Sequence, residues 1–492
     1  MTTQLRRFVL SLLVAALVLA LPLVAEAQGA KAKPPAPSAT FDQSLVVKPW
    51  TGDLDGMIKR RRIRILTPYS KTHYFIDRGV QRGVVYEAGT KLETHLNAKL
   101  KTGLDNKIHL VFVPTSRDQL YQSLVDGRGD IIASPITITP ERQKLVDFTT
   151  PTWRGVTEVL VTGPGAAIVT SKDDLSGKIV GVRVPSIYAE SLEALNVSLK
   201  QRGKSPVTIK ALPGSLEDED ILEMVNAGLV KATVVQDFTA KFWKQVLPAL
   251  TVHDTITLRE GADLGWVVRN DSPKLLAELN SLVATYGGEG SATRNMALRK
   301  YLQSTKFVKS ATSEAELVKF RSLIELFRKY GQQYDMDFML MLAQGYQESQ
   351  LDNNAKSHVG AIGVMQIMPA TGKELKVGDI KQVEANVNGG VKYMRKMIDT
   401  YFKDDDMDRL NKGLMAFASY NAGPGKIRSL RKEAERRGLN PNIWFGNVER
   451  VVGEKIGRET VTYVSNIYKY YVAYSLTMEE LKEKTVAKAT GD

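Results

Sequence analysis

The spacing of apolar residues between positions 62 and about 301 is typical of alternating strands and helices. Residues 62–66 alternate like a half-buried strand, 108–113 and 131–133 are short apolar runs, and 85–100 is long enough for a helix. The pattern repeats with strand-like runs at 178–184, 207–209 and 232–235 and a helix-like segment at 188–203. Strands that alternate with helices predict α/β units around a largely parallel sheet. We therefore expect two α/β lobes in succession, ending near Tyr301.

After about residue 310 the strand signal disappears. Segments 315–334, 337–348, 382–402, 409–420 and 459–476 have helical spacing, and clusters of Gly and Asn separate them. We expect an all-α domain here, with the boundary between residues 302 and 315. The predicted fold class is thus a two-lobed α/β domain followed by an all-α domain.

The first residues predict export. Arg6 and Arg7 precede an almost unbroken apolar run over 8–24, and Ala25-Glu26-Ala27 is a small-x-small cleavage pattern. We expect a signal peptide at 1–27; an uncleaved membrane anchor is the competing interpretation, because the apolar run is nearly long enough to span a bilayer. A tether rich in Pro, Ala and Lys is expected at 28–58. A lipoprotein is excluded because the chain has no cysteine.

The net charge and the cysteine and histidine content limit the partners and the chemistry that the chain can have. With 67 Lys and Arg against 54 Asp and Glu, the formal net charge is +13, which favours anionic partners such as a membrane surface or an acidic polymer. The basic residues are scattered without interleaved aromatics, so we expect no nucleic-acid partner; a generic solubilising surface is the alternative. The absence of cysteine excludes disulfides and thiolate catalysis. The five histidines lack metal-ligand spacing, and we expect neither a metal nor a cofactor.

Glu348 is the strongest candidate for catalysis. In 337–348 the apolar positions fall on one helical face, and Glu348 lies at the border of that face, near the expected helix end. A carboxyl partly removed from water has a raised pKa, as a general acid near neutral pH requires. Taken alone, the segment is more typical of an ordinary solvated glutamate near a helix end.

The surrounding residues change that interpretation. Residues 347–352 read QESQLD, 360–369 read GAIGVMQIMP, 386–393 read NVNGGVKY, 418–425 read ASYNAGPG and 459–464 read ETVTYV. In this order they resemble the motifs of the Slt-type lytic transglycosylases, a goose-lysozyme-like family. The resemblance implies a lysozyme-like fold for the all-α domain and peptidoglycan glycan strands as its substrate.

The resemblance also implies residue roles. Glu348 would be the acid and then the base, Tyr463 would support the oxocarbenium-like centre, and Ser349 would hold Glu348 in position. The residues expected to line the sugar cleft are Met365, Gln366, Tyr420 and Asn421, although Met365 is equally consistent with a core position.

Only one carboxylate stands out at this site. Glycoside hydrolysis usually uses two carboxylates that flank the bond. Asp352 is close in sequence but begins the polar turn 352–354, where a cap is the simpler expectation. A lone carboxylate suits the family's non-hydrolytic reaction, which forms a 1,6-anhydro ring on N-acetylmuramic acid. A true lysozyme with a distant second aspartate remains the alternative.

The α/β region resembles the family 3 extracellular solute-binding proteins. The matching stretches are 124–132, 136–142, 146–149, 173–182 and 234–237. The resemblance implies that Arg142 grips a ligand carboxylate and Asp237 a ligand ammonium, with Thr137 and Arg183 in the same site. Pro135 and the loop 184–187 depart from the family pattern, which favours a larger ligand such as a wall peptide, or a structural role, over a free amino acid.

The two resemblances set the expected domains. We expect a solute-binding-like domain at 59–305, a catalytic domain at 312–480 and a C-terminal tail at 481–492. The combination resembles the membrane-bound lytic murein transglycosylases of the F type. It implies a periplasmic enzyme, peripheral on the outer membrane, with an amino-acid or muropeptide ligand in the α/β domain. A binding protein with an inert helical domain is the alternative.

Overall fold

The computed structural model describes residues 48–489 apart from 104–105, 289, 311–313 and 404–405, and the predicted signal peptide lies outside this range. The expected tether ends earlier than residue 58. Helix α3 (Leu54–Lys59) is capped by Asp53, and Leu54 and Met57 are buried in the first lobe. The backbone N–H of Trp50 donates to Gly127 O at 2.8 Å, so residues 50–58 belong to the folded α/β domain.

The α/β domain is built on a seven-stranded sheet in the order β10-β7-β11-β5-β1-β4, with β6 paired to β11. As predicted, the apolar runs form β1 (Arg62–Thr67), β4 (His109–Pro114) and β5 (Ile131–Thr137), and β1 pairs with both of the others in parallel. The remaining elements of the first lobe are β2 (Phe75–Asp77), β3 (Val80–Arg82), α4 (Val84–Lys99), α5 (Leu120–Val125), α6 (Pro140–Gln143), β6 (Asp147–Phe148), α10 (Pro273–Leu282) and α11 (Ala292–Leu298).

The expectation of two lobes in succession is wrong, because the second lobe is inserted into the first. The chain leaves on β7 (Trp153–Thr162) and returns on β11 (Thr251–Val268), whose 18 residues pair with β7 and then with β5. These pairs are antiparallel, so only the first-lobe core of the sheet is parallel. The inserted lobe comprises β8 (Ile179–Arg183), α7 (Ile187–Gln201), β9 (Thr208–Leu212), α8 (Asp218–Asn226), β10 (Ala232–Gln236) and α9 (Asp237–Lys244).

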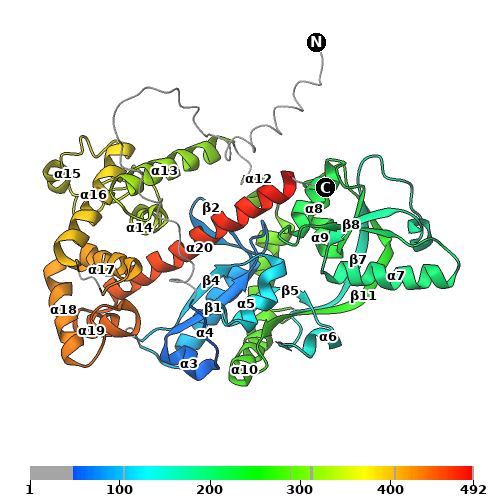
Figure 1. The fold of residues 1–492 in the computed structure, drawn as a ribbon, viewed down its shortest axis with the longest axis horizontal. Helices are drawn as coiled ribbons and strands as arrows, with labels where there is room; N and C mark the ends of the chain where they lie inside the picture. Colours follow the sequence, from blue (N-terminus) through cyan, green and yellow to red (C-terminus); the bar gives the residue numbers. More distant parts are fainter. Residues whose placement is uncertain (1–47, 104–105, 289, 311–313, 404–405, 490–492) are drawn as a thin grey trace, which may run out of the picture.

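The last third is helical, as predicted (Figure 1). Its largest core cluster gathers side chains from most of its helices around Met341, Met365 and Met415, all fully buried. None of the described helices is long and apolar enough to cross a membrane. The helices are α13 (Glu314–Gln333), α14 (Phe338–Ser349), α15 (Pro369–Leu375), α16 (Val383–Tyr401), α17 (Arg409–Ala422), α18 (Pro424–Arg436), α19 (Glu449–Ile456) and α20 (Arg458–Ala489).

Helix α20 joins the two domains. It runs from beside α17 and α19 across the first lobe to α8 of the second (Figure 1). Tyr474 Oη donates to Gly79 O at 2.7 Å, and Lys484 Nζ donates to Tyr69 O at 2.5 Å and lies 3.4 Å from Asp220. The expected tail at 481–492 is therefore wrong for residues 481–489, which continue the helix and contact both lobes.

Candidate active site

The end of helix α14 positions Glu348. Asp337 caps the start of the helix by accepting from the N–H of Met339 at 2.9 Å. The helix ends just past Glu348, where Gln350 and Leu351 have φ of 56° and 65°. These values are uncommon for residues with a Cβ and are seen mostly where the surrounding fold imposes them. Because the helix ends here, Glu348 lies on the last turn of a helix whose preceding residues 339–346 are buried.

Glu348 has neutral hydrogen-bond partners. Tyr463 on α20 donates its hydroxyl to Glu348 Oε1, so the two residues expected to carry the chemistry are in contact across helices α14 and α20. Burial raises the pKa of Glu348 to about 7, against the opposing effect of hydrogen bonds from Tyr463 and Gln344. No cation or second carboxylate of the described residues is among the groups that shift this pKa. The carboxyl can therefore be protonated near neutral pH and can also lose its proton there.

The loop of residues 360–367 lies against Glu348's helix and is held by Ser349 and Asn386. Ser349 Oγ donates to Val364 O at 2.9 Å and to Gly345 O at 3.2 Å, which ties the end of α14 to the loop. Asn386 on α16 is fully buried, accepts from the N–H of Met365 at 2.8 Å and donates to Ile362 O at 2.9 Å. These contacts tie Ser349 to the loop, its role in holding Glu348 stays a prediction, and Asn386 is an anchor that the prediction did not single out.

Met365 is part of the core. Its side chain is fully buried, and a Cβ on Gly390 would come within 2.6 Å of it. It supports the loop from behind, so the expected sugar contact through its side chain is wrong and its core interpretation is correct. Its backbone does matter, because Tyr420 Oη donates to Met365 O at 2.7 Å.

Gln366 and Asn421 differ in how far their side-chain amides are engaged within the chain. Gln366 has φ of 46° and turns its amide back onto Gly363 O and Ala355 O, at 2.9 Å and 3.1 Å. Asn421, at the end of α17, is exposed and accepts from Thr460 Oγ1 at 2.6 Å. A sugar contact by Gln366 would require its amide to leave these carbonyls, whereas the amide N–H groups of Asn421 have no hydrogen-bond partner among the described residues.

Asp352 has the capping role expected from the sequence. Its carboxylate accepts from the N–H of Asn354 at 2.9 Å within the turn that follows α14. It is not among the groups that shift the pKa of Glu348. The structure therefore provides no argument for Asp352 as a second catalytic carboxylate.

Comparison with known proteins agrees with this geometry. The profile of the transglycosylase SLT domain matches residues 325–443, which include Glu348, the loop 360–367 and Asn421. The profile of the bacterial extracellular solute-binding proteins of family 3 matches residues 66–303. Along the chain, the region matched by the family 3 profile, called the solute-binding domain below, is followed by the region matched by the SLT profile.

Curated relatives share this length and order. The membrane-bound lytic murein transglycosylase F of Desulfosudis oleivorans is 27% identical over 431 residues, which cover 83% of this chain and 89% of that protein. The protein of the same name from Ectopseudomonas mendocina is 27% identical over 450 residues and covers 87% of both chains. A crystal structure of a mutant of ArgBP from T. maritima is 20% identical and covers 51% of this chain and 99% of that one, with a TM-score of 0.41.

In the solute-binding domain, the predicted ligand residues contact other residues of the chain. Arg142 donates to Thr137 O and to Glu190 on α7 of the inserted lobe, each at 3.0 Å. Arg183 is buried and donates to Asp218 at 2.5 Å, and Asp237 pairs with Lys241 one turn along α9 at 3.1 Å. Their positions as ligand residues stay a prediction; in this conformation their charges are satisfied internally.

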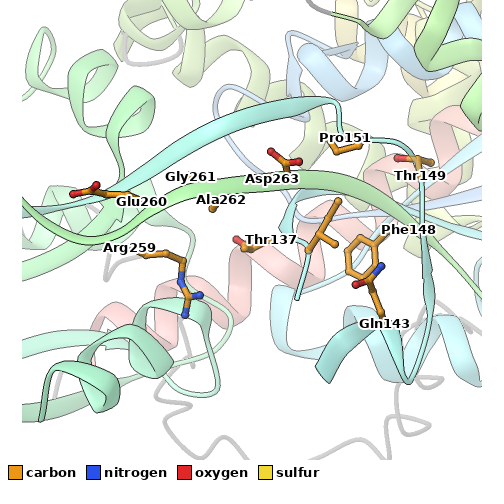
Figure 2. Close-up of a pocket in the computed structure, with 11 residues that line it drawn as sticks. Thr137, Gln143, Phe148, Thr149, Pro151, Arg259, Glu260, Gly261, Ala262 and Asp263 are labelled. Atoms are coloured by element: carbon orange, nitrogen blue, oxygen red, sulfur yellow. The ribbon is translucent and has the colours of Figure 1, made fainter. Parts of the chain in front are cut away.

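A hollow of about 520 Å³ lies beside β11, one of the two strands that connect the lobes. Figure 2 shows Thr137 and Phe148 on one side of it and the β11 segment 259–263 along the other. Thr137 is the predicted ligand residue that lines this space. Trp153, at the start of β7, stacks on Phe238 of α9 with ring centroids 4.5 Å apart. Aromatic packing thus also connects the start of β7 to the inserted lobe.

Proposed function

We propose that this chain is a peptidoglycan lytic transglycosylase that cleaves the β-1,4 bond between N-acetylmuramic acid and N-acetylglucosamine. The observation that supports it most is the Glu348–Tyr463 contact, in which a buried carboxyl with a pKa of about 7 has neutral partners. A general acid works best when its pKa lies near the working pH. The SLT profile, which matches residues 325–443 and so includes Glu348, and the curated relatives supply the substrate class.

The reaction uses Glu348 twice. Its carboxyl donates a proton to the glycosidic oxygen as the bond from that oxygen to C1 of the muramic acid breaks. The resulting carboxylate then takes the proton of the same sugar's C6 hydroxyl, whose oxygen bonds to C1 and closes a 1,6-anhydro ring. Tyr463 would stabilise the positive charge that develops at C1. No water is consumed, and Glu348 ends protonated as it began.

The two alternatives are less well supported. A hydrolytic lysozyme would place a second carboxylate within about 5 to 10 Å of the acid, and the nearest in sequence, Asp352, caps a turn instead. An inert helical domain would not need a buried carboxyl hydrogen-bonded to a tyrosine of another helix. Digestion of purified sacculi with the wild type and with Glu348→Gln tests activity: the wild type should release soluble muropeptides and the variant should not. Release by the variant would refute the assignment of Glu348.

The solute-binding domain is proposed to sense an amino acid or a muropeptide through Thr137, Arg142, Arg183 and Asp237. A ligand alters the enzyme only if it binds two conformations of the domain with different affinity. Helix α20 provides a physical link, because it bears Tyr463 and contacts both lobes. Calorimetry with amino acids and muropeptides should detect binding that Arg142→Ala abolishes while basal cleavage persists. Absence of binding at millimolar ligand would make the domain a spacer or a docking surface.

We further propose a periplasmic location, peripheral on the outer membrane. The predicted signal at 1–27 and the substrate class support export, and the cationic surface favours an anionic membrane face. Cell fractionation followed by a high-salt wash tests this. Peripheral binding predicts release by salt, whereas an uncleaved anchor predicts retention until detergent is added.

A further inference from the structure

Gln344 is a polar residue in the core beneath the catalytic glutamate. It lies on α14 one helical turn before Glu348, so the two side chains share a face of the helix. Its exposed fraction is zero, and its helix neighbours Ala343, Gly345 and Tyr346 are also buried. A buried amide must find hydrogen-bond partners or lower the stability of the fold.

The amide of Gln344 is only half satisfied. Its Nε2 lies 3.4 Å from the hydroxyl of Tyr463, a long hydrogen bond of the kind that catalytic groups often show before substrate binds. Its Oε1 is buried and has no partner among the described residues. An unpaired buried carbonyl costs about 1 to 3 kcal/mol, so an apolar side chain of the same length would suit the fold better. Packing alone therefore does not explain a glutamine here.

The contact with Tyr463 does explain it. A tyrosine hydroxyl has one hydrogen to donate and can accept from another donor. Because Gln344 donates to this oxygen, the hydroxyl hydrogen is directed to Glu348 Oε1. The result is a chain from amide to phenol to carboxyl, in which each hydrogen bond polarises the next.

The geometry points to Gln344 as a positioning residue that, from the same face of α14 and through Tyr463, holds and stabilises the carboxylate form of Glu348. This inference rests on the proposed function, in which Glu348 must become a carboxylate before it takes the C6 proton. Besides Tyr463, a titratable group near Glu348 among the described residues is Tyr420 on α17, whose pKa is raised by burial and by the nearby Glu348. Gln344 and Tyr463 are the two groups that oppose the effect of burial on the pKa of Glu348.

The test is Gln344→Leu, with Gln344→Met as a second apolar variant of closer length. Each should lower kcat about fivefold, corresponding to the loss of one modest hydrogen bond. Each should also move the fall in activity at high pH upward by at least about half a pH unit, because the carboxylate loses a stabilising donor. The melting temperature should stay the same or rise. Ser465→Ala is the matched control, since it removes another buried, unpaired oxygen two residues from Tyr463; its pH profile should match the wild type.

A double-mutant cycle isolates the route through the phenol. In a Tyr463→Phe background, Gln344→Leu should shift the pH profile by less than it does in the wild type, because the part of its effect that passes through the phenol is already lost. An unchanged pH profile in both single variants would overturn the inference, as would melting temperatures far below that of Ser465→Ala, which would make Gln344 a structural residue. Failure of the proposed function looks different, because Glu348→Gln would then remain active.

Discussion

Glu348 and Arg142 are the central charged residues of the two predicted sites, and the structure gives them opposite surroundings. Glu348 contacts Tyr463 and Gln344, which are both neutral. Arg142 forms an ion pair with Glu190 of the other lobe. A carboxyl without a counter-charge can gain and lose a proton near pH 7. A guanidinium that already has a carboxylate must give it up before it can bind the carboxylate of a ligand.

The energetic consequence differs between the sites. Glu348 is largely removed from water, so its environment changes its pKa strongly. The Arg142–Glu190 pair is exposed on the glutamate side, at 48% of its side-chain surface, and such pairs contribute about 0 to 1 kcal/mol. The first site is thus assembled for chemistry without rearrangement. The second is held by a weak contact that a ligand carboxylate can displace at small cost.

The largest effect expected is the loss of turnover in Glu348→Gln. The amide keeps the size of the side chain but cannot donate the proton, so turnover on sacculi should fall by at least about a hundredfold. Asp352→Asn is the matched variant and should stay within a few fold of the wild type, since Asp352 caps a turn. An equally large loss in Asp352→Asn would indicate two catalytic carboxylates and a hydrolytic mechanism.

Glu348 should also lower the stability of the folded state at high pH. Its pKa is about 7 in the folded protein against 4.5 for the ordinary group, so the unfolded chain loses the proton first as pH rises. The free energy of unfolding then falls between these two pH values, and the cost persists above pH 7 at about 3 kcal/mol. Thermal unfolding of Glu348→Gln should show a gain at pH 8 and none at pH 4. Glu435→Gln, at an exposed position of α18, is the control and should change little at either pH.

Tyr463→Phe should have a smaller effect on turnover. It removes a hydrogen bond to a charged group, which corresponds to a loss of roughly tenfold or slightly more. Because that bond lowers the pKa of Glu348, its removal should move the fall in kcat/KM at high pH further upward. A pH profile measured on sacculi checks both effects. Loss of activity as large as in Glu348→Gln would give Tyr463 a direct part in proton transfer.

The smallest effect concerns the solute-binding domain. Glu190→Gln removes the internal partner of Arg142, so affinity for a carboxylate ligand should rise by at most about fivefold, the equivalent of 1 kcal/mol. Calorimetry with amino acids and muropeptides measures it, and Glu193→Gln on the same helix is the control. Weaker binding in Glu190→Gln would mean that the glutamate contacts the ligand itself, and the contrast between the two sites would be lost.

The sequence singled out Glu348 and Tyr463 through motif residues, and the structure brings the two into contact. Local patterns predicted β1, β4, α4 and α14 to within a residue or two. The sequence-based prediction failed where contacts between residues far apart in the chain determine the structure. The return of β11 to the first lobe depends on its pairing with β5, and the alternation of strands and helices along the sequence does not reveal that pairing. Residues 481–489 contain three lysines and were expected to be a tail, but Asp220 and Glu223 of the inserted lobe pair with Lys484 and Lys488. Gln344 belongs to none of the sequence motifs, so only its burial beside Tyr463 in the structure indicates a role at the site.

The most direct test of the central claim is the mass of the products released from sacculi by the intact protein. A single carboxyl that acts as acid and then as base predicts fragments that end in 1,6-anhydro-N-acetylmuramic acid, each lighter by one water than a lysozyme product. Mass spectrometry before and after borohydride reduction separates the two cases, because the anhydro end cannot be reduced. Reducible N-acetylmuramic acid as the main end group would contradict the transglycosylase mechanism.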